Sequence, residues 1–413
     1  MHRGKPLTRE PSLTVAQARG IYVLKHIYMP TVQEWRQALT RQYNLRIESS
    51  DALCSEVDAA QRKRNNRGKS PVAWKPATPW VIAGNQTVPI KPIEMLQALG
   101  KISTPPITEL IDLSSTWAEI RYVWAFRPDL TGAQPRALRL NHTVKGLDFH
   151  QKTLLSDEFG VGLAAHFMEV CAGASNPVDV FVAKRSGQVI PRGIATRSLP
   201  DYLFSGPAPG EFFIVECKGT QSSRPTAIRQ LQRGTEQIRT VDVVGATKLT
   251  RLVIAAWLQR AITLLIVDPE NDDDEAPEAR TLSRWNPREA ALFADAKRMT
   301  YIGDRFGASR VVREYLRENV LFDEHPLTER GIHHTTYRGS EWRADMPDGR
   351  RLRMFRGLEA GLHEYIKKVA PEERVAEVLP WHERFPVESE GENGRAVVRS
   401  FSRDGFLLEI EIT

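Results

Sequence analysis

The sequence predicts a mixed α/β fold whose central part has the order helix, three strands, helix, strand. A helical apolar pattern over residues 154–173 precedes a series of short apolar runs with strand composition. A second helical pattern covers 224–241, and two almost continuous apolar runs follow it, as is typical of strands buried on both faces. Two Asp-Gly pairs near the C-terminus predict β-hairpins. We therefore expect a central αβββαβ core between a mixed N-terminal region and a C-terminal region of helices and β-hairpins.

Composition limits the class of protein. The chain has 413 residues, with 41% hydrophobic and 26% charged residues, which suits a globular protein of two or three domains. No apolar run approaches the ~20 residues that span a membrane, and the charged N-terminus has no apolar stretch behind it. These features favour the cytoplasm and no membrane partner. Three scattered cysteines exclude a disulfide framework, while a net charge of +6 is compatible with a nucleic-acid partner.

Three regions are expected. Residues 1–140 form a mixed α/β region of unknown role, 141–270 form the core, and 281–413 form an α/β region for binding substrate or partners. The acidic segment 270–280 is the best boundary. The expected elements of the outer regions are a helix over 31–43, strands within 78–90 and 117–126, a helical stretch over 286–319, and hairpins over 346–355 and 397–412.

The elements of the core are justified one by one. The helix over 154–173 begins with Ser156, a good N-cap, followed by two acidic residues. Residues 177–193 read as a short strand, a turn and a return strand. A Pro- and Gly-rich connection, 199–210, leads into the strand 211–220. The helix over 224–241 carries a proline near its first turn, and strands over 249–258 and 262–268 follow it.

The strand 211–220, "EFFIVECKGT", carries the candidate chemistry. Side chains alternate along a strand, so Glu216 and Lys218 face the same side. Asp179 lies in the earlier apolar run, and we expect its strand to neighbour this one. Two carboxylates at one sheet edge offer oxygen ligands for Mg²⁺, or for Mn²⁺ in its place. A nearby lysine can orient an attacking water and stabilise charge on a phosphate.

"PVD" followed 37 residues later by "ECK" resembles the PD-(D/E)xK motif of the restriction-endonuclease-like nuclease superfamily. The core of that superfamily is αβββαβ, the order expected here for residues 150–268. The resemblance implies that Asp179 and Glu216 bind the metal, with the Cys217 carbonyl as a further ligand, and that Lys218 positions the water.

The resemblance also implies two supporting residues on helices. Many members place a glutamate on the first helix, and both Glu158 and Glu169 qualify; we prefer Glu158, which lies nearer the expected edge. Some members place a glutamine on the helix after the lysine strand, a role open to Gln230 or Gln237. From the residues themselves, Arg224, Arg229 and Arg233 form a basic stripe suited to nucleic-acid phosphates.

The sequence therefore predicts a magnesium-dependent endonuclease that hydrolyses phosphodiester bonds, with DNA favoured over RNA as substrate. Antiviral defence or restriction is the expected setting, by fold-level analogy. The alternatives are a catalytically silent nucleic-acid-binding or scaffold subunit, and a subunit that cuts only within a larger complex. A homodimer is also compatible with the sequence.

Overall fold

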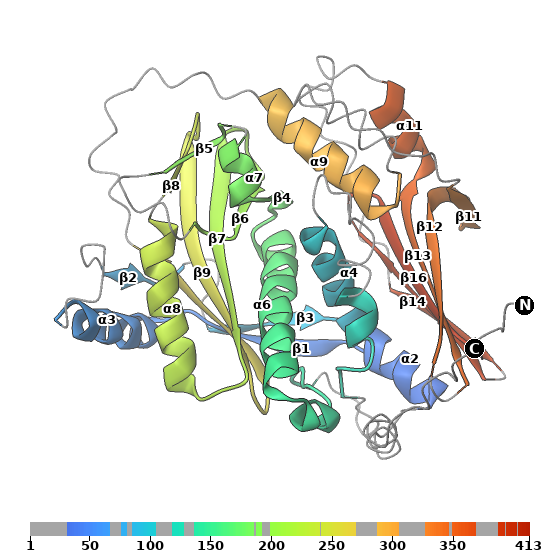
Figure 1. The fold of residues 1–413 in the computed structure, drawn as a ribbon, viewed down its shortest axis with the longest axis horizontal. Coiled ribbons are helices and arrows are strands. Elements are labelled where there is room, and N and C mark those ends of the chain that lie inside the picture. Colours follow the sequence, from blue (N-terminus) through green and yellow to red (C-terminus); the bar gives the residue numbers. More distant parts are fainter. Residues whose placement is uncertain are drawn as a thin grey trace, which may run out of the picture.

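Two large β-sheets, a two-stranded sheet and the helices around them make up the described part of the computed structural model (Figure 1). The structure describes residues 31–66, 76–80, 85–104, 118–127, 136–185, 187–191, 199–239, 241–269, 287–304, 327–346, 349–368, 387–392, 394–402 and 404–413. The mixed α/β class expected from the sequence is confirmed. No helix within these ranges is long and apolar enough to cross a membrane.

The first sheet contains the central strands and three strands from the N-terminal region. Its order is β3 (Gln86–Ile90), β1 (Tyr43–Glu48), β10 (Ile262–Pro269), β9 (Lys248–Leu258), β7 (Glu211–Thr220), β6 (Tyr202–Ser205) and β4 (Ser175–Asp179), with β2 (Ala77–Thr78) paired to β10. Strands β7 and β9 are parallel, as are β1 and β10, whereas β4, β6 and β7 pair antiparallel. The N-terminal region thus extends the sheet of the core.

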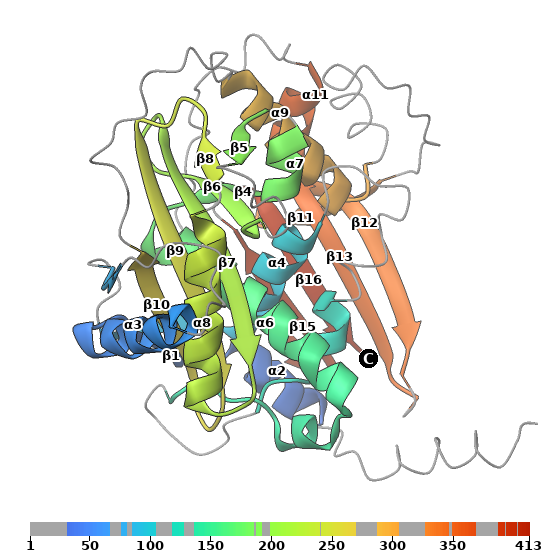
Figure 2. The same ribbon diagram turned by 60° about the vertical axis from the view of Figure 1, so that its left-hand side comes forward.

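Helices cover both faces of this sheet, because β7, β9 and β10 are apolar on both sides. On one face, α6 (Phe149–Cys171) packs against β7 and β9, and α4 (Pro92–Ser103) packs on α6. On the other face, α8 (Arg224–Ile238) packs against β7 and β9, with α3 (Asp51–Asn65) beside it (Figure 2). The short α7 (Val180–Arg185) joins the second face.

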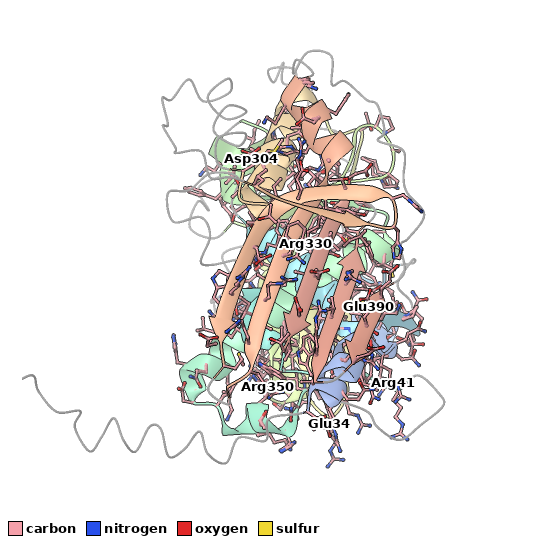
Figure 3. The ribbon with its side chains drawn as sticks, turned by 90° about the vertical axis from the view of Figure 1, so that its right-hand side faces the viewer. Glu34, Arg41, Asp304, Arg330, Arg350 and Glu390 are labelled. Atoms are coloured by element: carbon pink, nitrogen blue, oxygen red, sulfur yellow. The ribbon has the colours of Figure 1, made fainter. Side chains whose placement is uncertain are left out.

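The second sheet is antiparallel and belongs to the C-terminal region. Its order is β11 (Thr328–Ile332), β12 (Thr335–Asp345), β13 (Arg351–Glu359), β16 (Phe406–Ile412), β15 (Arg395–Phe401) and β14 (Glu388–Glu392). Its apolar face packs on α4 and on α2 (Val32–Thr40). The other face, seen in Figure 3, carries paired charges such as Arg330 with Glu341 and Arg399 with Glu409. The expected Asp-Gly hairpins are confirmed as β12–β13 and β15–β16.

Several boundaries differ from the expectations. Helix α6 begins two turns before Ser156, because Asp148 supplies the N-cap by accepting from the Gln151 N–H. Ser156 lies inside the helix, where its hydroxyl donates to the Lys152 carbonyl. Residues 118–122 are helical, so the strand expected within 117–126 is wrong. The acidic segment 270–280 lies outside the described residues.

The middle of the three core strands also differs. The expected return strand after Ser186 exists as β5 (Val189–Pro191), but it pairs with β8 (Val241–Val243) rather than with β4. The strand that lies between β4 and β7 is β6, inside the segment interpreted as a connection. The expected order helix, three strands, helix, strand is therefore present, with β6 as the second strand.

A buried lysine joins the C-terminal region to the core. Lys297, on α9 (Pro287–Tyr301), donates to the carbonyl of Ile102 (3.0 Å) and to the carbonyl of Pro177 on β4 (2.9 Å). Burial lowers the pKa of Lys297 to about 7, against the opposing effect of Asp179. The amine is therefore neutral in the folded protein at alkaline pH, where it is protonated in the unfolded chain.

This difference predicts a pH-dependent contribution to stability. Between pH 7 and about pH 10 the unfolded state binds more protons than the folded state, so stability due to Lys297 rises with pH. We expect the difference in free energy of unfolding between wild type and Lys297→Met to grow in favour of wild type from pH 7 to pH 9.5. Denaturant titrations across this range measure it, with flat differences expected below about pH 6. Parallel curves would contradict the assignment.

Candidate active site

The candidate site lies where β7 continues beyond β6. Strand β6 begins at Tyr202, which pairs with Val215, so the last five residues of β7 have no strand on that side within the described chain. This stretch contains Glu216, Cys217 and Lys218. Polar side chains from other elements approach β7 along the edge that β6 does not cover.

Asp201 is the carboxylate that reaches this edge. It directly precedes β6, and its Oδ2 accepts a hydrogen bond from the Cys217 N–H at 2.8 Å. Leu203 pairs with Ile214, so the alternation of side chains places Asp201 and Glu216 on the same face of the sheet. Burial raises the pKa of Asp201, against the opposing effect of Lys218. Asp201 and Glu216 are therefore the two carboxylates that the sheet brings together.

Glu216 is fully buried, at 0% exposure, and forms an ion pair with Lys218 through Oε1. Its Oε2 is buried and has no hydrogen-bond partner among the described residues. Burial, together with the charge of Asp201, raises the pKa of Glu216 to about 8. Gly234 on α8 makes room for it, since a Cβ there would lie 3.2 Å from the Glu216 Cγ. One carboxylate oxygen thus remains available for a ligand.

Lys218 is partly exposed and carries the charge of the site. Burial disfavours its ammonium form, but Glu216 and Asp201 outweigh this effect, so its pKa is raised. Lys218 is therefore a cation that can donate hydrogen bonds and attract an anion. A lysine in this state is unsuited to accepting a proton from water.

Asp157 approaches from α6. Its pKa is raised by burial, and the charges of Lys218 and Asp201 also act on it. Helix α6 comes this close because both partners carry glycine at the contact. A Cβ on Gly160 would lie 2.6 Å from the Lys218 carbonyl oxygen, and one on Gly219 would lie 1.7 Å from the Ser156 carbonyl oxygen.

The expectation that the Asp179 strand neighbours β7 is wrong, because β6 lies between them. Asp179 pairs in register with Tyr202, which places it on the opposite face from Asp201. It ends β4 and caps α7, accepting from the Phe181 N–H at 2.7 Å and the Val182 N–H at 3.4 Å. This local capping explains why residues 180–185 form a helix rather than a longer strand.

The two helix carboxylates considered from the sequence have other partners. Glu158 accepts from Arg121 at 2.9 Å and from the Tyr122 hydroxyl. Glu169 pairs with Lys101 at 2.8 Å, far along α6 from the site. Of the carboxylates on α6, Asp157 interacts electrostatically with Lys218, whereas Glu158 and Glu169 form ion pairs with Arg121 and Lys101.

The residues of α8 divide between the site and the surface. Gln230 donates to the Gly219 carbonyl at 3.2 Å, and its buried Oε1 has no partner among the described residues. Gln237 donates to the Leu199 carbonyl, two residues before Asp201. Both glutamines thus contact segments that flank the site.

The basic stripe is smaller than the sequence suggested. Arg224 binds Glu48 (2.6 Å) and Glu56 (2.9 Å), so its charge is already neutralised. Arg229 and Arg233 are exposed and have no acidic partner within the described residues. These two arginines, one turn apart on α8, remain available for an anionic ligand.

The donor set fits a hard divalent cation. Asp201 and Glu216 supply carboxylate oxygens, the Cys217 carbonyl is adjacent, and the free Oε2 of Glu216 is a buried oxygen without a hydrogen-bond partner in the described structure. No three His, Cys, Asp or Glu side chains of the described ranges converge into a metal cage. Magnesium is commonly held by one or two carboxylates and keeps several waters, so two carboxylates suffice.

A sequence pattern indicates Asp201, although the segment 199–210 is predicted to be a connection. Asp201 follows Pro200 and precedes the apolar Tyr202–Phe204, which is the pattern of a proline, an acid and a short strand. It lies only 15 positions before Glu216. Surrounding proline and glycine made the segment look like a loop. Asp157 gave no separate signal beside Glu158.

Comparisons with protein families, with curated proteins and with solved structures find no match to this chain. The chemistry of the site therefore rests on its own geometry.

The contact between α6 and β7 gives a prediction about the site's framework. Gly219→Ala would force a Cβ against the backbone of α6, so we expect the free energy of unfolding to fall by about 3 kcal/mol. Gly146→Ala is the matched control, because nothing lies within 4 Å of its added Cβ. Denaturant unfolding of both variants measures the difference, and equal losses would contradict the close approach.

Proposed function

We propose that this protein is a metal-dependent nuclease that hydrolyses phosphodiester bonds of nucleic acid. The observation that carries the proposal is the pair Asp201 and Glu216, held on one face beside the Lys218 ammonium. Pro200–Asp201 with Glu216 and Lys218 also resembles the PD-(D/E)xK motif more closely than the set containing Asp179. The order α6, β4, β6, β7, α8, β9 agrees with the core of that superfamily.

Asp201 and Glu216 would hold Mg²⁺ or Mn²⁺, and a bound cation would supply an activated water and charge neutralisation at the phosphate. Two crowded carboxylates with raised pKa values favour such a cation, because it offsets their mutual repulsion. Asp157, whose charge interacts with those of Lys218 and Asp201, would orient a water at the same site.

Lys218 stabilises negative charge on the phosphate oxygens and orients the water, since it is protonated. Gln230 fixes the end of β7 through the Gly219 carbonyl, which holds Lys218 in position. Arg229 and Arg233 extend the positive surface along α8, where they neutralise phosphates without reading sequence. The DNA preference, a defence role and a cytoplasmic location belong to the same proposal.

Cleavage assays test the proposal directly. Purified protein is incubated with plasmid, single-stranded DNA and RNA in Mg²⁺ or Mn²⁺. We expect cleavage that EDTA abolishes and that Lys218→Ala, Asp201→Asn and Glu216→Gln each reduce about 100-fold or more. Asp179→Asn retains most activity, because Asp179 caps α7 instead of facing the site.

Lys248→Ala is the matched control for Lys218, because it lies at the opposite end of the same strand pair and is exposed. Loss of cleavage in this variant would indicate general damage. If no substrate is cut under any condition, and Lys218→Ala binds nucleic acid like wild type, the protein is a silent binding subunit and the enzyme proposal fails.

The surface arginines predict a salt effect. Each phosphate neutralised contributes about 0.9 to the slope of log affinity against log salt for duplex DNA. Arg229→Gln/Arg233→Gln should therefore lower the magnitude of that slope by about 1.8. Fluorescence anisotropy at several salt concentrations measures it, with Lys248→Gln as the single-charge control. An unchanged slope would place the nucleic acid elsewhere.

A further inference from the structure

An exposed phenylalanine lies beside the candidate site. Among the described residues, three large apolar side chains are exposed: Phe181 at 59%, Phe149 at 87% and Leu154 at 38%. Phe181 belongs to the first turn of α7, two residues after Asp179 at the end of β4. Its neighbour Val180 donates to the Asp201 carbonyl at 3.0 Å, so one residue separates the ring from the backbone of a candidate metal ligand.

The backbone of Phe181 is held firmly, although its side chain is exposed. Its N–H donates to the Asp179 carboxylate at 2.7 Å, and Val180 and Ala183 on either side are buried in the core. The ring is therefore presented to solvent from a fixed position. An exposed aromatic ring on a fixed backbone is suited to contact a planar ligand at little entropic cost.

The charges on this face of the sheet indicate what that ligand is. Lys218 pairs with Glu216 at the site, and the exposed Arg229 and Arg233 lie on α8, which covers the same face of the sheet as α7. An exposed aromatic ring and cations on one face of the sheet match a polyanion that also carries exposed aromatic planes. Single-stranded nucleic acid has both features, whereas a duplex presents phosphates and keeps its bases stacked.

We propose that Phe181 stacks on an unpaired base next to the phosphate held at the Asp201–Glu216 site, so that the substrate is single-stranded or locally unpaired where it is cut. This inference rests on the proposed nuclease function. It extends that function to the substrate class and assigns Phe181 as a residue that determines it.

Binding measurements test the stacking without requiring catalysis. Affinity for a single-stranded oligonucleotide and for its duplex is measured by anisotropy in Ca²⁺, for wild type, Phe181→Ala, Phe181→Trp and Phe149→Ala. We expect Phe181→Ala to bind the single strand about 5- to 150-fold more weakly, with duplex affinity unchanged. Phe181→Trp and Phe149→Ala should bind like wild type. Phe149, the first residue of α6, is the matched exposed phenylalanine.

A fluorescent adenine analogue in the oligonucleotide reports the stacking itself. Its emission should fall on binding to wild type and to Phe181→Trp, but not to Phe181→Ala. Equal affinity of Phe181→Ala and wild type for the single strand overturns the inference. So does an equal loss for single strand and duplex, because it would assign Phe181 to the fold or to general contact.

Cleavage assays in Mn²⁺ separate this inference from the proposed function. Stacking that depends on Phe181, without cleavage of any substrate, supports the inference and overturns the enzyme proposal. Cleavage that depends on Lys218 but is the same with Phe181→Ala, on single-stranded and duplex substrates, overturns the inference alone.

Discussion

Strand β6 begins opposite Val215, and the part of β7 beyond that pair determines how the site is built. A strand edge left open inside a protein has N–H groups that need partners. The Asp201 carboxylate is the partner of one such group, because it accepts a hydrogen bond from the Cys217 N–H at 2.8 Å. Helix α6 packs closely on the face of this same end of β7, because Gly160 and Gly219 lack the Cβ atoms that would block it. The Asp201 carboxylate therefore reaches the part of β7 that carries Glu216 and Lys218 because β6 is short.

Burying the Glu216 carboxylate next to Asp201 lowers the stability of the folded state. Glu216 has no exposure, and its pKa of about 8 reflects burial and the charge of Asp201. On the outer face of the second sheet, by contrast, Glu409 pairs with Arg330 and Arg399, so charges are balanced. Buried carboxylates with perturbed pKa values in an incompletely paired group mark functional sites more often than structural ones. The contrast within one protein supports the assignment of function to β7.

The sequence predicted the mixed α/β class and one neighbouring pair of the candidate site. Glu216 and Lys218 were predicted together because the period of a strand is exact over two residues. Asp201 was missed because β6 has only four residues and its flanks are rich in proline and glycine, so local propensity favoured a loop. The apolar run that contains Asp179 predicts one continuous strand, yet the Asp179 carboxylate caps α7 and ends the strand. The sequence alone does not show which of the adjacent residues Asp157 and Glu158 faces the site. They point in different directions from the helix, and the ion pair that holds Glu158 comes from Arg121, which is distant in the sequence.

The N-terminal region also positions the site, through α8. Gln232 and Glu236 are buried on α8, and their partners come from α3, where Gln61 bonds to both and Arg64 to Glu236 at 3.0 Å. Buried polar groups that lose such partners destabilise a fold by about 1–3 kcal/mol each. Because Gly234, which makes room for Glu216, lies between these two residues, α3 fixes the part of α8 that contacts the site. The core over 141–270 therefore depends on residues before it, and β1 strengthens this dependence by pairing with β10.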